Sequence, residues 1–178
     1  MASKLGKSIL IFSSKGGVGK STIAICLAGI FSRLNKKTLI VDFDFSSGAI
    51  GVMLNKPSDK TVYNFVDDYQ NNRYNSLKDY ITKYNENIDF ISSCKDPRQG
   101  VQIESAYVEI IIEKARCEYD FVIIDTNHLL SEFNVSLLDK CDESFLVLSN
   151  DLIDLKNTRN LINIFKACNA EPPEFLFE

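Results

Sequence analysis

The chain has 178 residues, enough to bury a sizeable core, and its 45% hydrophobic and 25% charged residues are ordinary for a globular protein. A net charge of −4 gives no electrostatic support for general nucleic-acid binding, and no apolar run approaches the length of a membrane span. Five scattered cysteines without a C-x-x-C pair argue against a zinc ribbon or a disulfide framework. We therefore expect one cytoplasmic domain over residues 1–178, with no nucleic-acid signature and no visible membrane attachment.

The first predicted elements enclose a glycine-rich turn. A strand over residues 8–13 leads into it, and an apolar-periodic helix over residues 21–34 follows, with Asn35 as its stop and Cys26 expected to be buried. This order forms a phosphate cradle, because backbone N–H groups converge at the positive end of the helix. Lys20 would bind the β- and γ-phosphates and Ser21 would ligate Mg²⁺. The sequence thus predicts a nucleoside-triphosphate site made of Gly16, Gly17, Val18, Gly19, Lys20, Ser21 and Thr22.

Two further apolar runs end in aspartates. Residues 38–41 predict a strand buried on both faces of a parallel sheet, and Asp42-Phe43-Asp44 follows directly. The strand period places both carboxylates on one side at the carboxyl end, where open α/β sheets bind ligands. Residues 121–124 form a similar run that ends in Asp125. Such an aspartate downstream of a phosphate loop is typical of the residue that holds Mg²⁺.

The remaining pattern alternates strands and helices. Further strands are expected over residues 88–92, 144–148 and from 175, and helices over residues 61–69, 77–84, 102–117, 131–139 and 152–168. In the last helix, the residues expected to face inward are Leu155, Leu161, Ile162 and Phe165. The alternation predicts a doubly wound, mainly parallel sheet flanked by helices. Because the chain ends inside its last predicted strand, we expect the C-terminal part of the domain to be missing.

The stretch K-G-G-V-G-K-S resembles the deviant Walker A motif of the ParA/MinD family of P-loop ATPases. Ser14 stands where the usual first glycine would be, and the neighbouring Lys15 matches the additional lysine that marks this family. The resemblance implies an ATP/ADP- and Mg²⁺-dependent ATPase that is slow and stimulated by a partner. It assigns Asp44 to orient the attacking water and Asp42 to support the metal beside Ser21 and Asp125. A plainer reading of Asp42 is a carboxylate that bonds nearby backbone N–H groups.

The same resemblance gives Lys15 a role in trans. In the family, the equivalent lysine reaches the phosphates of a second subunit, so the ATP-bound form is a homodimer. The layout of residues 130–162 is similar to the CpaE/TadZ branch, which localises pilus-assembly or secretion machinery, often at a cell pole. This implies protein partners from such a system and recruitment to the pole or the inner membrane surface. A MinD-like division-site regulator and a ParA-like partitioning ATPase are the alternatives within the family.

Readings from other classes are a scaffold that binds ATP without hydrolysis, a dethiobiotin-synthetase-like enzyme and a nitrogenase-iron-protein-like reductase. Residues 45–100 hold only two arginines, which disfavours a carboxylate substrate pocket. Cys94 and Cys117 lack the glycine-rich surroundings that a bridging cluster needs, which disfavours the reductase. His128 is the only histidine, and a lone loop histidine is given no catalytic role.

Overall fold

The computed structural model describes residues 5–129, 131–167 and 174–177. The strands are β1 (Lys7–Phe12), β2 (Thr38–Phe43), β3 (Thr82–Lys83), β4 (Ile88–Ile91), β5 (Phe121–Thr126), β6 (Glu143–Leu148) and β7 (Glu174–Phe177). The helices are α1 (Lys20–Arg33), α2 (Ile50–Met53), α3 (Val62–Gln70), the 3₁₀-helix η1 (Leu77–Tyr80), α4 (Pro97–Gly100), α5 (Ser105–Arg116), α6 (Glu132–Lys140) and α7 (Leu152–Ala167). Within these residues, no helix carries an apolar stretch long enough to cross a bilayer.

The described strands form one sheet in the order β3-β4-β2-β5-β1-β6-β7. Every neighbouring pair is parallel except β3 with β4. In this register Asp125 of β5 pairs with Ile11 of β1 on one side and with Asp42 of β2 on the other. The prediction of a doubly wound, mainly parallel sheet is confirmed, and the predicted site residues meet at one edge of it.

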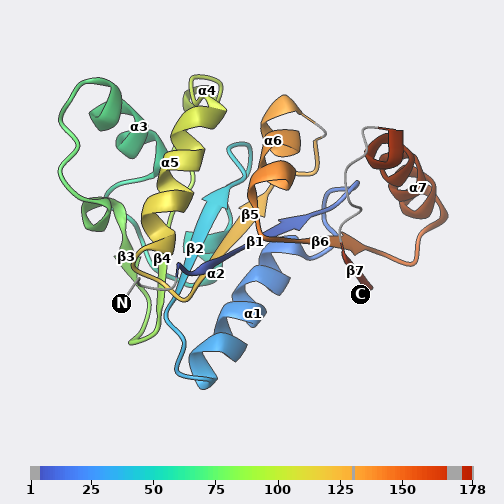
Figure 1. The fold of residues 1–178 in the computed structure, drawn as a ribbon, viewed down its shortest axis with the longest axis horizontal. Helices are drawn as coiled ribbons and strands as arrows, with labels where there is room; N and C mark the ends of the chain where they lie inside the picture. Colours follow the sequence, from blue (N-terminus) through green and yellow to red (C-terminus); the bar gives the residue numbers. More distant parts are fainter. Residues whose placement is uncertain (1–4, 130, 168–173, 178) are drawn as a thin grey trace.

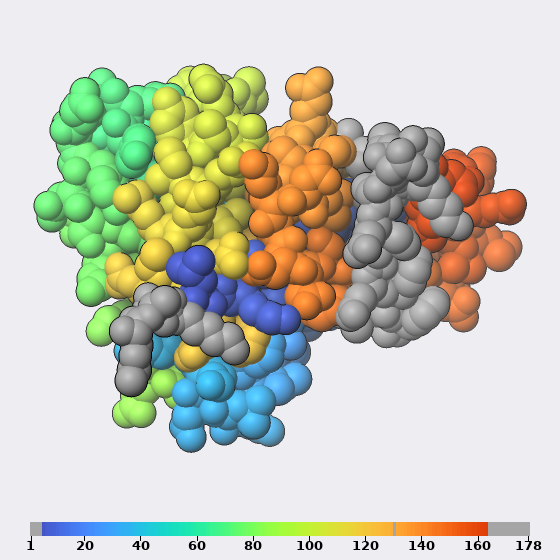
Figure 2. All heavy atoms as spheres, viewed as in Figure 1, coloured from blue at the N-terminus to red at the C-terminus, as the bar shows by residue number. Residues whose placement is uncertain are grey.

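Helices cover both faces of the sheet (Figure 1). On one face, side chains of β1, β2 and β5 pack against α1 and α2. On the other face, the alternate side chains of the same strands pack against α3, η1, α5 and α6. The space-filling view shows α5 and α6 side by side over this second face (Figure 2). This alternation is why the strand sequences read as continuous apolar runs.

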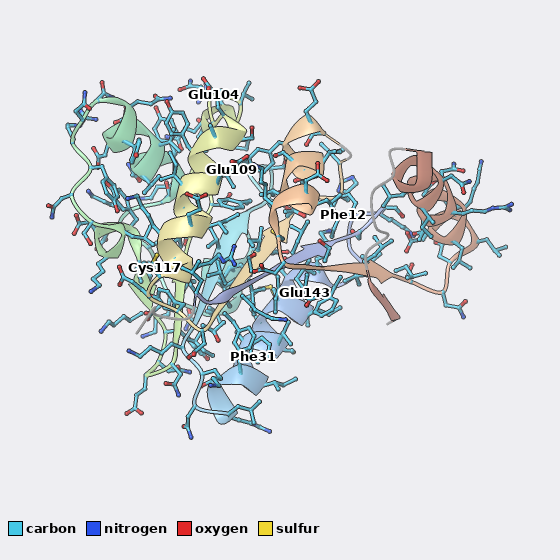
Figure 3. The ribbon with its side chains drawn as sticks, viewed as in Figure 1. Phe12, Phe31, Glu104, Glu109, Cys117 and Glu143 are labelled. Carbon is cyan, nitrogen blue, oxygen red and sulfur yellow. The ribbon has the colours of Figure 1, made fainter. Side chains whose placement is uncertain are left out.

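Helix α1 contacts the sheet through small residues. Ala24 and Ala28 are fully buried, whereas Ile30 and Leu34 are more than half exposed. Phe31, which Figure 3 labels on α1, stacks on Phe121 with ring centroids 3.8 Å apart. The prediction that Cys26 is buried is wrong, because this residue lies between the two alanines in sequence and therefore on the opposite side of the helix.

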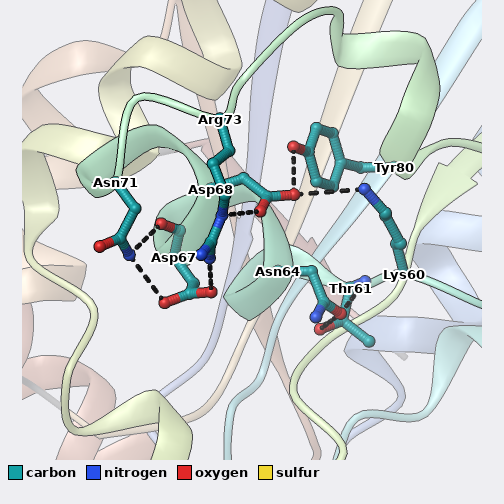
Figure 4. A network of polar contacts seen from close by, with 8 residues as sticks. All are labelled: Lys60, Thr61, Asn64, Asp67, Asp68, Asn71, Arg73 and Tyr80. Atoms are coloured by element: carbon teal, nitrogen blue, oxygen red, sulfur yellow. Dashed lines mark hydrogen bonds and ion pairs between the residues drawn. The ribbon is translucent and has the colours of Figure 1, made fainter.

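The helix predicted over residues 77–84 is also wrong. The chain forms the short η1 there and then the two residues of β3. Leu77 and Tyr80 are buried with a spacing of three, which fits a 3₁₀ turn better than a continuing α-helix. The Tyr80 hydroxyl donates to Asp68 of α3 at 2.9 Å, and Asp68 also pairs with Lys60 and Arg73 (Figure 4). These contacts, distant in sequence, fix the turn against α3.

Candidate nucleotide-binding site

The loop between β1 and α1 is held in shape by hydrogen bonds of its own side chains. Gly17 and Gly19 have φ of 79° and 89°, a left-handed conformation that favours glycine, and Gly19 is the N-cap of α1. The buried Lys20 donates from Nζ to Ser13 Oγ at 3.0 Å, and that hydroxyl donates to the backbone oxygen of Lys15 at 2.6 Å. Val18 is buried at the loop's tip. These contacts within the loop therefore stabilise the shape of the cradle.

Asp125 is the least satisfied polar residue beside this loop. Its side chain is fully buried, and among the described residues neither carboxylate oxygen has a hydrogen-bond partner. Burial raises the pKa of Asp125 to about 6. The Ser21 hydroxyl and the Lys20 ammonium oppose this rise, so both lie close to the carboxylate, although neither completes a hydrogen bond of normal geometry to it. An unpaired buried carboxylate is costly unless a ligand satisfies it.

These residues fit a magnesium-bound nucleotide. Within the described part of the chain, no group of three His, Cys, Asp or Glu side chains could hold a metal alone. A cation at this edge would therefore depend on Asp125, Ser21 and oxygens of the nucleotide, which is the coordination Mg²⁺ usually takes with nucleotides. Burial lowers the pKa of Lys20, and Asp125, Asp44 and Asp154 counter this effect.

The two aspartates at the end of β2 differ in their surroundings. Asp42 is buried, and its oxygens accept from the N–H groups of Asp44 and Ile50, both at 3.1 Å. Burial raises the pKa of Asp42 to about 8, and the neighbouring Asp125 adds to the rise. Strand β2 ends at Phe43, so Asp44 does not continue the strand face as predicted. Instead it begins a turn, where its Oδ1 accepts from two following N–H groups at 3.0 Å. The catalytic and metal-binding roles of both residues stay predictions.

The first turns of α7 contact the loop through two acids that the sequence analysis did not single out. Lys15 Nζ lies 2.6 Å from Asp151 Oδ2, and this hydrogen bond raises the pKa of Lys15. Ser14 Oγ donates to Asp154 Oδ1 at 2.7 Å and lies 3.0 Å from Thr158 Oγ1. Ser14, which stands where the usual first glycine of the loop would be, thus joins the phosphate loop to α7.

Asp154 is fully buried, and both of its carboxylate oxygens accept hydrogen bonds. Besides Ser14, the N–H and the hydroxyl of Ser149 donate to its Oδ2 at 2.7 Å and 3.0 Å. Burial opposes ionisation, but these hydrogen bonds hold the pKa of Asp154 below its usual value. The prediction that Leu155 faces inward is wrong, because Leu155 is 39% exposed and the buried side of α7 begins with Asp154 and Thr158. Their spacing of four, continued by Leu161, is the signal that could have shown this face.

The segment after β5 also lies against the cradle. Thr126 Oγ1 donates to the backbone oxygen of Ile11 at 3.0 Å, which ties β5 to β1 just before the loop. Exposed His128 lies over Gly16, since a side chain built there would place its Cβ 3.3 Å from Nδ1 of the histidine. The sequence analysis assigned His128 no catalytic role, and the structure places it beside Gly16 of the cradle.

A family model described as an AAA domain matches residues 6–174 of the chain. The chain is 27% identical over 160 residues to the septum site-determining protein MinD of Helicobacter pylori, covering 89% of this chain and 59% of the relative. It is 28% identical over 167 residues to the chromosome-partitioning ATPase Soj of Treponema pallidum, covering 91% and 64%. The chain therefore spans about three fifths of the length of these curated relatives.

Solved structures agree on the fold. A ParA family ATPase from Chlorobium tepidum TLS has a TM-score of 0.83 at 23% identity, covering 97% of this chain and 73% of that one. The septum site-determining protein MinD from Pyrococcus horikoshii OT3, complexed with Mg-ADP, has a TM-score of 0.78 at 23% identity, covering 97% and 69%. At these identities the likeness shows a common fold.

Proposed function

This chain belongs to the AAA domain family, among the ParA/MinD P-loop ATPases, and from that premise we propose that it is a nucleotide-dependent switch. In this proposal it binds ATP with Mg²⁺ and hydrolyses it slowly, and its ATP-bound form dimerises. The unpartnered oxygens of buried Asp125, beside Lys20 and Ser21, are the observation that carries the proposal.

Each residue then has a chemical task. The N–H groups of the loop and the Lys20 ammonium bind phosphate oxygens, and Ser21 and Asp125 hold the cation. A cation held there would supply positive charge against the negative charge that develops on the phosphate during hydrolysis. Asp44 orients the attacking water from a turn that its own carboxylate stabilises. Asp42 fixes this turn through the N–H groups of Asp44 and Ile50.

Lys15 is the residue through which the nucleotide would act on assembly. Its ammonium is held by Asp151 of the same chain, and the Lys15 side chain is about two-fifths exposed and so accessible from outside. To reach a nucleotide in a second subunit it must exchange this partner for phosphate oxygens. In the dimer, the phosphates would replace Asp151 as the partner of this ammonium. Because the contact needs both the second subunit and its nucleotide, nucleotide binding and dimer formation would favour each other.

The direct test is nucleotide binding followed by size measurement. Calorimetry should show Mg²⁺-dependent ATP binding that the Asp125→Asn variant weakens by about a hundredfold, since it removes one charged metal ligand. Light scattering should show that the Asp44→Ala variant, which retains ATP, is a dimer with Mg-ATP and a monomer with Mg-ADP. Lys15→Ala should abolish the dimer and leave binding nearly unchanged. A monomer with saturating Mg-ATP in the Asp44→Ala variant would refute the switch.

For the cellular role, we propose that the switch positions a large assembly from the cytoplasm, together with protein partners. The names of the relatives, septum site-determining and chromosome-partitioning, support placement of the division site or of DNA. Positioning of pilus or secretion machinery stays a prediction that rests on the layout of residues 130–162. Deleting the gene separates these roles, since it should yield minicells, anucleate cells or loss of pili, respectively.

A further inference from the structure

A second polar hollow, of about 220 Å³, opens on the β4 side of Asp42, away from β5. Its polar lining comes from the segments after α2 and β4, and apart from Asp42 none of it belongs to the phosphate cradle. These lining residues are Lys56, Ser58, Thr61, Ser92, Ser93 and Lys95. Of the residues that the structure describes, Asp42 is the only acid that lines the hollow, and both of its oxygens already accept backbone N–H groups.

The hollow is rich in donors that lack an anion. Ser58 Oγ lies 2.7 Å from Ser92 Oγ and 2.8 Å from Thr82 Oγ1, which forms a short chain of hydroxyls. Lys95 Nζ donates to the backbone oxygen of Asp59 at 3.3 Å. Over the described residues, no carboxylate lies within ion-pair distance of either lysine of the hollow. Two exposed lysines that line the same hollow as this chain of hydroxyls form an environment that favours a negative ligand.

Two glycines keep the hollow open. A Cβ at Gly51 would lie 3.1 Å from Ser92 Oγ, so a side chain there would press on the hydroxyl row. Gly48 has a φ of 39°, and a Cβ there would lie 3.0 Å from the Cβ of Ser93. Larger residues at either position would narrow the space that the hydroxyls face.

Two residues that line the hollow form hydrogen bonds with Asp44, the predicted water-orienting residue. Ser93 Oγ donates to the backbone oxygen of Asp44 at 2.8 Å, and Asp42 accepts from the N–H of Asp44 at 3.1 Å. The backbone N–H and C=O of Asp44 thus both form hydrogen bonds with residues that line the hollow. A ligand that moves Ser93 would change the position of Asp44.

We propose that this hollow binds one small anionic group, a phosphate or carboxylate of a metabolite, between Lys56 and Lys95, and that Ser93 transmits its binding to Asp44. The volume suits such a group and is too small for a whole nucleotide, because sites for drug-sized ligands start at about 300 Å³. The hydroxyl row supplies hydrogen bonds to the anion's oxygens, and the lysines supply the charge.

Amide spectra of the ¹⁵N-labelled full chain test the binding. The cradle is first filled with Mg²⁺ and a non-hydrolysable ATP analogue, and inorganic phosphate or malonate is then titrated at constant ionic strength. We expect saturable shifts over residues 56–61 and 92–95, and the stronger of the two ions identifies the preferred group. The Lys56→Ala/Lys95→Ala variant should bind at least about tenfold more weakly, as the loss of a charge-assisted hydrogen bond predicts.

The matched control removes two surface lysines elsewhere. Lys36→Ala/Lys140→Ala lowers the charge equally, and binding should stay unchanged. Absence of shifts with both ions, shifts confined to residues 15–22, or equal weakening by both double variants would overturn the proposal. Because the hollow and the cradle are read at different amides, failure of the analogue to bind would count against the proposed ATPase alone.

The Ser93→Ala variant tests transmission. It removes the hydroxyl that bonds Asp44 but leaves both lysines, so the anion should still bind within about twofold. In the wild type the amides of residues 44–47 should move when the anion binds. In this variant they should move clearly less, although Gly48 N–H still donates to the same backbone oxygen at 2.9 Å. Equal movement of these amides in both proteins would refute transmission through Ser93.

Discussion

Two buried aspartates lie on either side of the phosphate loop, and their surroundings are opposite. Asp154, on the α7 side, accepts hydrogen bonds from Ser14 and Ser149, which hold its pKa below the usual value. Asp125, on the β5 side, has no hydrogen-bond partner in the described residues, and burial raises its pKa to about 6. A satisfied buried carboxylate is part of the architecture, whereas an unsatisfied one indicates a place for a ligand.

The comparison also separates two kinds of sequence signal. Asp125 follows an apolar strand downstream of a glycine-rich turn, so a local pattern predicts it. Asp154 stands in the first turn of a helix, and its partner Ser14 is 140 positions away. Three experiments test how far the contrast between these two residues holds.

The largest effect is expected from Asp154→Ala. This change leaves the hydroxyls of Ser14 and Ser149 and one backbone N–H without their acceptor, which should lower the free energy of unfolding by about 3 kcal/mol. Urea denaturation of the nucleotide-free protein measures it. Asp151→Ala is the matched control, because this partly exposed neighbour bonds mainly to Lys15 and should change stability little. Equal effects of the two changes would show that burial of Asp154 contributes nothing.

Asp125→Asn should alter how stability depends on pH. The folded-state pKa of about 6 is higher than the ordinary value of about 3.9, so the folded protein binds this proton more tightly than the unfolded chain. The contribution of this carboxyl to the free energy of unfolding is therefore greatest below about pH 4 and falls as the pH rises to about 6. In buffer with a chelator, the free energy of unfolding of the variant should lack that decline, which amounts to about 3 kcal/mol. Exposed Asp139→Asn serves as the control, and a decline of wild-type size in the Asp125 variant would contradict the assignment.

Ser14→Gly restores the usual first glycine of the loop and should have the smallest effect. It removes the bonds to Asp154 and Thr158, which should cost about 1 kcal/mol of stability in urea denaturation. ATP affinity should remain within about threefold, because the cradle groups of residues 16–21 are unchanged. A large loss of affinity would mean that α7 helps to shape the cradle rather than only to support it.

The parts of the fold that sequence reasoning predicted are those encoded by nearby residues. The strand, turn and helix around the loop follow from glycine spacing and apolar periodicity. The meeting of Asp42 with Asp125 follows from parallel strands that end at one edge. The predictions were wrong where contacts between residues distant in sequence determine the local structure. Cys26 is exposed because α1 packs through alanines, and the turn at Tyr80 is fixed by Asp68.

The buried polar side of α7 was missed for a related physical reason. Periodicity marks a face by apolar residues, and Asp154 and Thr158 do not contribute to that signal although both are buried. The polar hollow was missed as well, because its lysines and hydroxyls come from two segments, after α2 and after β4, that are distant in sequence.

The edge strand β3 limits how copies of this protein can join. It offers only Thr82 and Lys83, runs antiparallel to β4, and carries a charge on its exposed residue. Short, charged edges resist strand-to-strand addition, which is the route to fibres and open-ended aggregates. Strand addition is therefore disfavoured at the β3 edge of the sheet.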